Sequence, residues 1–278
     1  MADTLDIGRI RITRVLAGTH WWDGGAFFGV VPRTLWGRNR IVDNLNRIEA
    51  AFNCFVIETG QQKLLIETGG GTRHDPLWRE RTRMHSPVAI RDAVTQAGFD
   101  PDCIDTVINT HLHWDHSGGN TIDTIEGPQP AFPNAKYFVR RNELFHAREQ
   151  HPRDAVSYIP INYEPLIASG HLHLLDGDYE PAPGIRLRVT PGHNRDMMIV
   201  LAKSDGQTWC HLADLVPHAA QIIPTWVAAF DLYPLETIAN KQQILARAAD
   251  ENWWLSFGHD PVVAFAQIKL DNGKFQLR

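Results

Sequence analysis

The sequence predicts an α+β fold in which strands outnumber helices. Segments with period-two alternation or short apolar runs recur along the chain, whereas few segments show helical spacing. The predicted strands comprise residues 10–16, 53–58, 63–68, 105–109, 136–140, 172–175, 185–189, 197–202, 208–212, 253–257 and 262–270. The predicted helices comprise residues 87–97, 142–150 and 235–249. Proline and glycine are spread through turns and form no linker, so we expect residues 1–278 to form a single domain.

Two tight connections fit antiparallel pairing of neighbouring strands. Thr-Gly-Gln-Gln at 59–62 and Ser-Asp-Gly-Gln at 204–207 each join two apolar runs, and Asp-Gly favours a two-residue hairpin turn. Each hairpin precedes a segment rich in metal-binding residue types. This order suggests two half-domains of similar build, although no sequence repeat proves a duplication.

Composition excludes several function classes. A formal net charge of −5 gives no electrostatic footprint for nucleic acid, and no segment reaches the ~20 apolar residues that a membrane helix needs. The N-terminus is polar and acidic and lacks the apolar stretch of a secretory signal, so we expect a cytoplasmic protein. Cys54, Cys103 and Cys210 lie far apart and form no Cys-x-x-Cys pair, so we expect buried free thiols.

One short segment carries the most specific chemistry. The heptapeptide Thr-His-Leu-His-Trp-Asp-His begins at Thr110 and directly follows a predicted strand. Side chains two apart in an extended chain project to the same side, so His111 and His113 can reach one ion together. The Ser-Gly-Gly-Asn that follows favours a turn, which lets Asp115 and His116 approach a second ion. The segment therefore predicts ligands for two metals.

A complete site needs further ligands, and the later strand ends supply them. His193 follows the predicted strand 185–189 in Thr-Pro-Gly-His, Asp214 follows strand 208–212, and His259 follows strand 253–257. By contrast, no Asp-His follows His171 and His173, so we interpret that pair as ordinary strand residues.

The order of these motifs resembles the metallo-β-lactamase-fold hydrolase superfamily over about residues 50–265. The resemblance implies a four-layer αββα sandwich with metals at one edge between two mixed sheets. The segments that begin Asp23-Gly24-Gly25, Ala213-Asp214-Leu215 and Asp231-Leu232-Tyr233 are similar to the quorum-quenching lactonase and methyl parathion hydrolase branches.

The resemblance implies seven metal ligands from histidine and aspartate alone. One ion would take His111, His113 and His193, a second would take Asp115, His116 and His259, and Asp214 would bridge both. Nitrogen and carboxylate ligands without a thiolate favour Zn²⁺ and leave Mn²⁺, Fe²⁺ and Co²⁺ open.

The implied activity is hydrolysis of a lactone or ester, such as an acyl-homoserine lactone. A hydroxide bridging the two metals would attack the substrate, with Asp115 and Asp214 as the catalytic carboxylates. His218 is a plausible additional polar group. A phosphotriesterase and a mononuclear iron redox enzyme of the same fold stay open as alternatives, whereas the flavodi-iron type is disfavoured because His113 occupies its glutamate position.

Three positions depart from the pattern of the superfamily. Glu67 stands where the superfamily usually has the aspartate of Asp-Thr-Gly, so support of the first histidine pair is expected to differ. Asn-Arg-Asp follows His193 in place of the frequent Thr-Pro-Gly. Pro217 stands where lactonases have a tyrosine, which leaves the electrophilic helper and the proton donor to the leaving group unassigned.

Aromatic residues predict an apolar pocket for a small, uncharged substrate. The candidates for its wall are Trp21, Trp22, Phe27, Phe28, Trp36, Trp226 and Phe230. We expect residues 17–45 to form an exposed aromatic arm, which favours a homodimer.

Overall fold

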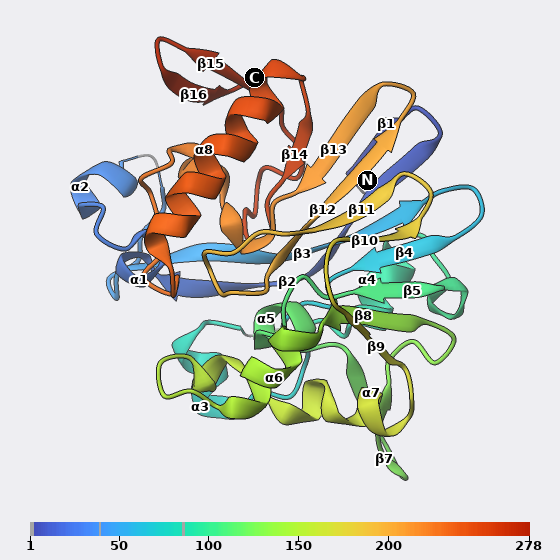
Figure 1. The fold of residues 1–278 in the computed structure, drawn as a ribbon. Coiled ribbons are helices and arrows are strands. Elements are labelled where there is room, and N and C mark those ends of the chain that lie inside the picture. Colours follow the sequence, from blue (N-terminus) through green and yellow to red (C-terminus); the bar gives the residue numbers. More distant parts are fainter. Residues whose placement is uncertain (1–2, 39, 85–86) are drawn as a thin grey trace.

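Two β-sheets pack face to face, with helices on both outer sides, in the computed structural model, which describes residues 3–38, 40–84 and 87–278 (Figure 1). The first sheet comprises, in spatial order, β1 (Thr4–Ile7), β2 (Ile10–Asp23), β3 (Arg47–Glu58), β4 (Lys63–Ile66), β5 (Thr106–Ile108), β8 (Lys136–Arg140) and β9 (Leu172–Leu175). Strands β1 to β4 pair antiparallel, whereas β4, β5, β8 and β9 run parallel. The sheet is therefore mixed.

The second sheet is also mixed. It comprises β10 (Tyr179–Ala182), β11 (Ile185–Val189), β12 (Met198–Ser204), β13 (Gln207–His211) and β14 (Trp254–Ser256). Its strands pair antiparallel except for the parallel pair β13 and β14. Two separate ribbons pair β6 (Thr121–Thr124) with β7 (Gly127–Pro130) and β15 (Ile268–Asp271) with β16 (Lys274–Leu277).

Short helices follow many strands, and one long helix covers the second sheet. They are α1 (Gly24–Phe28), α2 (Arg33–Trp36), α3 (Pro76–Arg81), α4 (Ile90–Gln96), α5 (Trp114–Ser117), α6 (Arg141–Glu149), α7 (Glu164–Ala168) and α8 (Pro234–Asp250). Within the described ranges, no helix has both the length and the apolar character needed to cross a bilayer.

Three apolar cores separate the layers. In β3, Phe55 packs in the core between the sheets with Trp209 of β13, while its neighbour Val56 packs on the outer side with Val94 of α4. Helix α8 buries Ile244 against the other outer face. Because β3 is covered on both faces, its residues 54–57 are all apolar and buried. The layers follow the order αββα, which confirms the predicted fold class.

Many predicted elements are confirmed, with shifted ends. Strands 136–140, 172–175 and 185–189 have the predicted bounds, and both hairpins join the expected strands. Strands β2 and β3 are longer than predicted because their outer halves pair with each other and have mixed polarity. The predicted strand 262–270 is wrong for most of its length, since only Ile268–Asp271 forms a regular strand.

Two expectations about exposure are wrong. Residues 17–23 belong to β2, and Phe27, Phe28 and Trp36 are buried in a small aromatic core, so residues 17–45 do not form an exposed aromatic arm. Cys54 and Cys210 are buried as predicted, but Cys103 is exposed in a short turn of 3-10 helix ahead of β5.

Candidate metal centre

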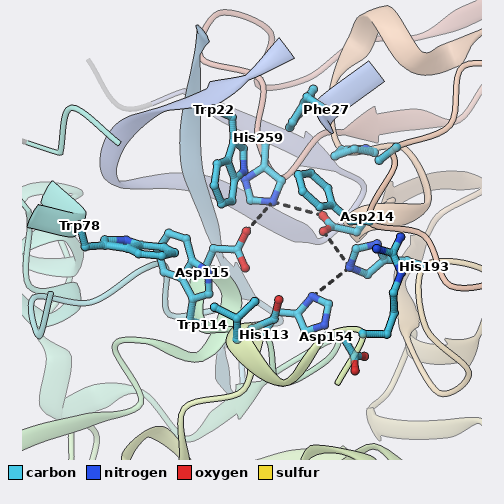
Figure 2. A pocket seen from close by; sticks show the side chains of 16 residues that line it. Trp22, Phe27, Trp78, His113, Trp114, Asp115, Asp154, His193, Asp214 and His259 are labelled. Atoms are coloured by element: carbon cyan, nitrogen blue, oxygen red, sulfur yellow. Dashed lines mark hydrogen bonds and ion pairs between the residues drawn. The ribbon is translucent and has the colours of Figure 1, made fainter. Parts of the chain in front are cut away.

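The seven predicted ligands lie together at one edge of both sheets, in segments that follow strands; Figure 2 labels His113, Asp115, His193, Asp214 and His259. His111 and His113 follow β5, and Asp115 and His116 lie on the one-turn helix α5. The other three come from the second sheet: His193 after β11, Asp214 after β13 and His259 after β14. The site therefore joins the ends of two packed sheets.

Three histidines form the first group. His111, His113 and His193 each offer a ring nitrogen, and these nitrogens lie within 4.8 Å of one another. His113 Nδ1 lies 3.0 Å from His193 Nε2. All three rings are buried, so few waters can compete for these nitrogens.

The second group combines two histidines with a carboxylate. Asp115, His116 and His259 also offer atoms within 4.8 Å of one another. His259 Nε2 lies 3.2 Å from His116 Nε2 and 3.6 Å from Asp115 Oδ2. This donor set of nitrogen and oxygen suits a divalent cation.

Asp214 lies between the groups and turns one oxygen toward each. Its Oδ2 is 3.3 Å from His193 Nε2 and 3.9 Å from His111 Nε2. Its Oδ1 is 3.3 Å from His116 Nε2 and 3.2 Å from His259 Nε2. This is the arrangement of a carboxylate that can bridge two cations.

Unpartnered buried atoms show that the cluster fits a metal. His111 Nε2, His113 Nε2 and Asp214 Oδ1 are buried and make no hydrogen bond. Buried polar atoms normally have a partner, and a divalent ion among these groups would supply one for the inward-facing atoms. The His and Asp clusters therefore suit a divalent metal site.

Burial also favours the neutral imidazoles that bind metals. Burial lowers the pKa of His111 and His113 well below the usual value. Burial alone would raise the pKa of Asp214, but the surrounding His116, His259 and His193 outweigh it and hold that pKa well below its usual value. These shifts favour the ionised form of Asp214 and the neutral forms of His111 and His113.

A second set of contacts fixes the orientation of the rings. Asp231 Oδ1 lies 3.0 Å from His193 Nδ1, and Thr237 donates a hydrogen bond to the other oxygen of Asp231. The carbonyl of Ala51 lies 2.9 Å from His259 Nδ1. Such partners hold the other ring nitrogen toward the metal side. The sequence reasoning did not assign this role to Asp231, because the pairing depends on loops that are 38 residues apart.

Glu67, one of the three positions that depart from the superfamily pattern, is linked by hydrogen bonds or close contacts to a histidine of each group. It follows β4 with a positive φ of 62° and is buried. Its carboxylate lies 3.2 Å from His116 Nδ1 and accepts a short hydrogen bond from the Thr110 hydroxyl. That hydroxyl lies 3.0 Å from His111 Nδ1. Glu67 thus contacts His116 directly, whereas its link to the first histidine pair runs through Thr110 to His111.

A pocket beside the cluster has a cavity volume of about 140 Å³. We call it the metal-centre pocket. Its aromatic wall consists of Trp22, Phe27, Trp78, Trp114 and Phe230. Trp22, Phe27 and Phe230 were predicted, whereas Trp78 and Trp114 were not, because nothing local indicates that α3 and α5 meet there. The other candidates, Trp21, Phe28, Trp36 and Trp226, do not line this pocket.

The polar side of the pocket differs from the expectation as well. Arg153, Asp154 and Ser157 line it, and Arg153 donates a hydrogen bond to the carbonyl of Ala229 across the opening. Pro217 also lines it, where a tyrosine would offer a hydroxyl. His218 does not line this pocket, and its Nδ1 lies 3.0 Å from Asp260 instead.

The fold and the two ligand groups together define a metallo-β-lactamase-fold protein with a site suited to a divalent metal. A family model described as the metallo-beta-lactamase superfamily matches residues 51–259, so the chain belongs to this superfamily.

Several individual proteins are similar to this chain in sequence or in structure. The N-acyl homoserine lactonase AiiA of Bacillus thuringiensis subsp. kurstaki is 29% identical over 154 residues, 51% of this chain and 54% of the relative. The chain thus spans about half the length of the curated relatives it matches. A probable metal-dependent hydrolase from Staphylococcus aureus superposes with a TM-score of 0.90 at 28% identity over 99% of both chains. AidC, a dizinc quorum-quenching lactonase, shares the fold with a TM-score of 0.81 at 19% identity, over 100% of this chain and 96% of AidC.

Proposed function

We propose that this protein is a dinuclear metal-dependent hydrolase of lactones or esters, of the acyl-homoserine lactone type. The observation that carries the proposal is the position of Asp214, whose two oxygens each face a different ligand group. A single ion would need only one of these groups. The lactonase relatives support a carbonyl substrate.

The proposed metals are two divalent ions, with Zn²⁺ favoured by the nitrogen and oxygen donors. His111, His113 and His193 would hold one, and Asp115, His116 and His259 the other, with Asp214 between them. When bound, such a pair supplies Lewis acidity toward the carbonyl oxygen and lowers the pKa of water toward neutrality.

The side chains of the chain would orient the reactants and move the proton. Asp115 and Asp214 both line the metal-centre pocket, so either carboxylate can accept a proton from the attacking water. As the new C–O bond forms and the lactone C–O bond breaks, that proton can pass to the leaving oxygen. The phenol of a tyrosine is not needed for this transfer, which is consistent with Pro217 on the pocket wall.

The shape of the pocket supports a substrate with a small reacting end. A cavity of about 140 Å³ is smaller than pockets that enclose a whole drug-sized ligand, which occupy roughly 300–1,000 Å³. A lactone ring would fill it, and an acyl chain would extend along the aromatic wall. Trp22 and Phe230 lie side by side in that wall, with ring centroids 5.6 Å apart.

Metal analysis and a substrate panel test the proposal together. We expect two ions per purified chain and turnover of an acyl-homoserine lactone above that of an aryl ester or a phosphotriester. Faster turnover of the phosphotriester would favour the alternative, a phosphotriesterase. One iron per chain with no hydrolysis of any of these substrates would instead indicate the mononuclear redox enzyme.

A histidine pair provides matched variants. His113→Ala should abolish turnover and lower the metal content, whereas His173→Ala should leave both unchanged because His173 lies in β9 outside either ligand group. Turnover at the wild-type rate in His113→Ala would contradict the proposed site.

A further inference from the structure

A second cavity, of about 580 Å³, shares no lining residue with the metal-centre pocket. We call it the Arg40 cavity. It opens between the segment that follows α2, the loop before Ile223 and the C-terminal ribbon β15–β16, which Figure 1 shows at the end of the chain. Its apolar lining includes Ile41, Ile223, Val262 and Leu277.

The rim of this cavity is unusually apolar for a protein surface. Ile41 and Val262 are each 82% exposed, and Ile223 and Leu277 are about half as exposed. These side chains belong to segments that are far apart in sequence, so the fold gathers them at one opening. Exposed apolar side chains that surround a hollow commonly mark a binding site.

Arg40 places a guanidinium at this apolar surface without a carboxylate in direct contact among the described residues. Within those residues its Nε is buried and has no hydrogen-bond partner, and one of its amino groups donates to the carbonyl of Trp36. The guanidinium lies over the ring of Phe28, 5.2 Å from its centroid. In the described part of the chain, Arg40 forms no ion pair. Burial lowers the pKa of Arg40, in keeping with a cation that is partly removed from water.

Asp260 acts on Arg40 electrostatically and opposes the lowering of its pKa, but in the described part of the chain the two form no ion pair. Asp260 is buried and accepts hydrogen bonds from the amides of Ala219, Val262 and Val263, while His218 Nδ1 lies 3.0 Å from it. Its oxygens are therefore occupied. Glu49 is exposed and lies beyond ion-pair distance of Arg40.

We propose that the Arg40 cavity binds an alkyl carboxylate, with the carboxylate on the Arg40 guanidinium and the alkyl chain along Ile223, Val262 and Leu277. Such a ligand matches the cavity in charge and in polarity. Guanidinium groups bind carboxylates through two parallel hydrogen bonds, and an aliphatic wall lowers the free energy of an alkyl chain by removing it from water. A neutral hydrocarbon would leave the guanidinium without an anion, and a cation would be repelled.

Calorimetry with decanoate, and with decan-1-ol as the uncharged control, tests the role of Arg40. Decanoate should bind the wild-type protein, and Arg40→Gln should raise its Kd at least about tenfold, as the loss of a hydrogen bond between charged groups does. The Kd of decan-1-ol should not change with this substitution. Equal decanoate affinity in both proteins would overturn the proposal.

Substitutions at the rim of the Arg40 cavity test the proposal even if Arg40→Gln fails to fold. Val262 is exposed, so Val262→Glu and Val262→Lys should both fold, with weaker decanoate binding in the first and unchanged or tighter binding in the second. Phe230→Ala, in the metal-centre pocket, should leave decanoate affinity unchanged. If Phe230→Ala weakens binding and the Val262 variants do not, decanoate occupies the metal-centre pocket and the proposal fails.

Two further measurements identify the occupant. N-octanoylglycine in place of decanoate separates an N-acyl amino acid from a free fatty acid as the source, and dependence of either ligand on Arg40 supports the proposal. Sedimentation of wild-type protein and Val262→Glu tests for a second copy of this chain. A dimer that Val262→Glu dissociates, together with no binding of either probe, would show that the cavity is a subunit interface and overturn the proposal.

Discussion

At the residue scale, four of the five candidate ligand histidines have a partner behind the ring. Thr110 contacts His111, Glu67 contacts His116, Asp231 contacts His193, and the carbonyl of Ala51 contacts His259. In these four rings, the partner leaves the other nitrogen facing the cluster. Changes in them should alter metal affinity without removing a ligand.

Glu67→Asp tests this role. The shorter side chain should lose contact with either His116 or Thr110, since Glu67 now spans both. We expect metal affinity to fall about 10–100-fold, measured by competition with a chromogenic chelator. An aspartate that binds metal as tightly as the wild-type glutamate would show that the longer side chain has no specific role.

Unlike the ligand histidines with a partner behind the ring, His20 is a buried histidine with no hydrogen-bond partner among the described residues. It is fully buried, neither ring nitrogen makes a hydrogen bond, and the ring stacks on Phe52 with centroids 4.3 Å apart. His20→Phe should keep the stacking and remove two unsatisfied nitrogens. We expect the free energy of unfolding to rise by about 1 kcal/mol in urea denaturation. A decrease would show that His20 has a polar partner, such as a buried water.

At the element scale, helix α5 is held in place by glycines. A Cβ on Gly118 would lie 2.3 Å from the carbonyl oxygen of Gly70, so the chain of residues 69–71 can approach the end of α5 only because neither side carries a side chain. Asp115 and His116 lie on this helix, so its position sets the second ligand group.

Gly118→Ala should therefore destabilise the protein and weaken metal binding together. We expect a loss of about 1–3 kcal/mol in the free energy of unfolding, as overpacking produces, with fewer ions bound per chain. Gly177→Ala is the matched control, because no atom lies within 4 Å of its added Cβ. A stable Gly118→Ala variant with full metal content would contradict the close approach.

Local sequence patterns predicted some elements well and others poorly. The strands at 136–140, 172–175 and 185–189 were predictable because each is bounded by turn residues and buries apolar side chains. The one-turn helix α5 was not predicted, since four residues are too few to show a helical period. The sequence predicted a turn that brings Asp115 and His116 near the first histidines, and the ring centroids of His111 and His116 are indeed 4.1 Å apart.

The candidate ligands were easier to predict from the sequence than the wall of the pocket. Histidines and aspartates at strand ends are recognisable one at a time, so all seven candidates could be named before their positions were known. The wall depends on which aromatic side chains meet after folding. Trp36 and Phe28 instead stack on each other in a separate core, with centroids 5.2 Å apart, and nothing in the sequence distinguishes them from Trp22.

At the scale of the whole molecule, the ligand groups connect two sheets that otherwise meet through an apolar core. His111, His113 and His116 come from the first sheet, whereas His193, Asp214 and His259 come from the second. An ion bound by the proposed ligands would therefore stabilise the contact between the sheets as well as the site, because it would bind only the assembled state.

Removing metal should lower the melting temperature and not only the activity. We expect chelation with dipicolinate to lower the Tm by several degrees in differential scanning calorimetry, and added zinc to restore it. His113→Ala should show a smaller shift on chelation than His173→Ala. An identical Tm with and without metal in the wild-type protein would show that the ions do not help to hold the sheets together.

The proposed ligands also lie far apart along the chain. His116 and His259 are 143 residues apart, and His113 and His193 are 80 residues apart. An ion held by such pairs would close long loops, and closing a long loop restricts an unfolded chain more than closing a short one. A cut in a surface loop between two of these ligands would therefore leave the fragments joined for as long as the ion stays bound.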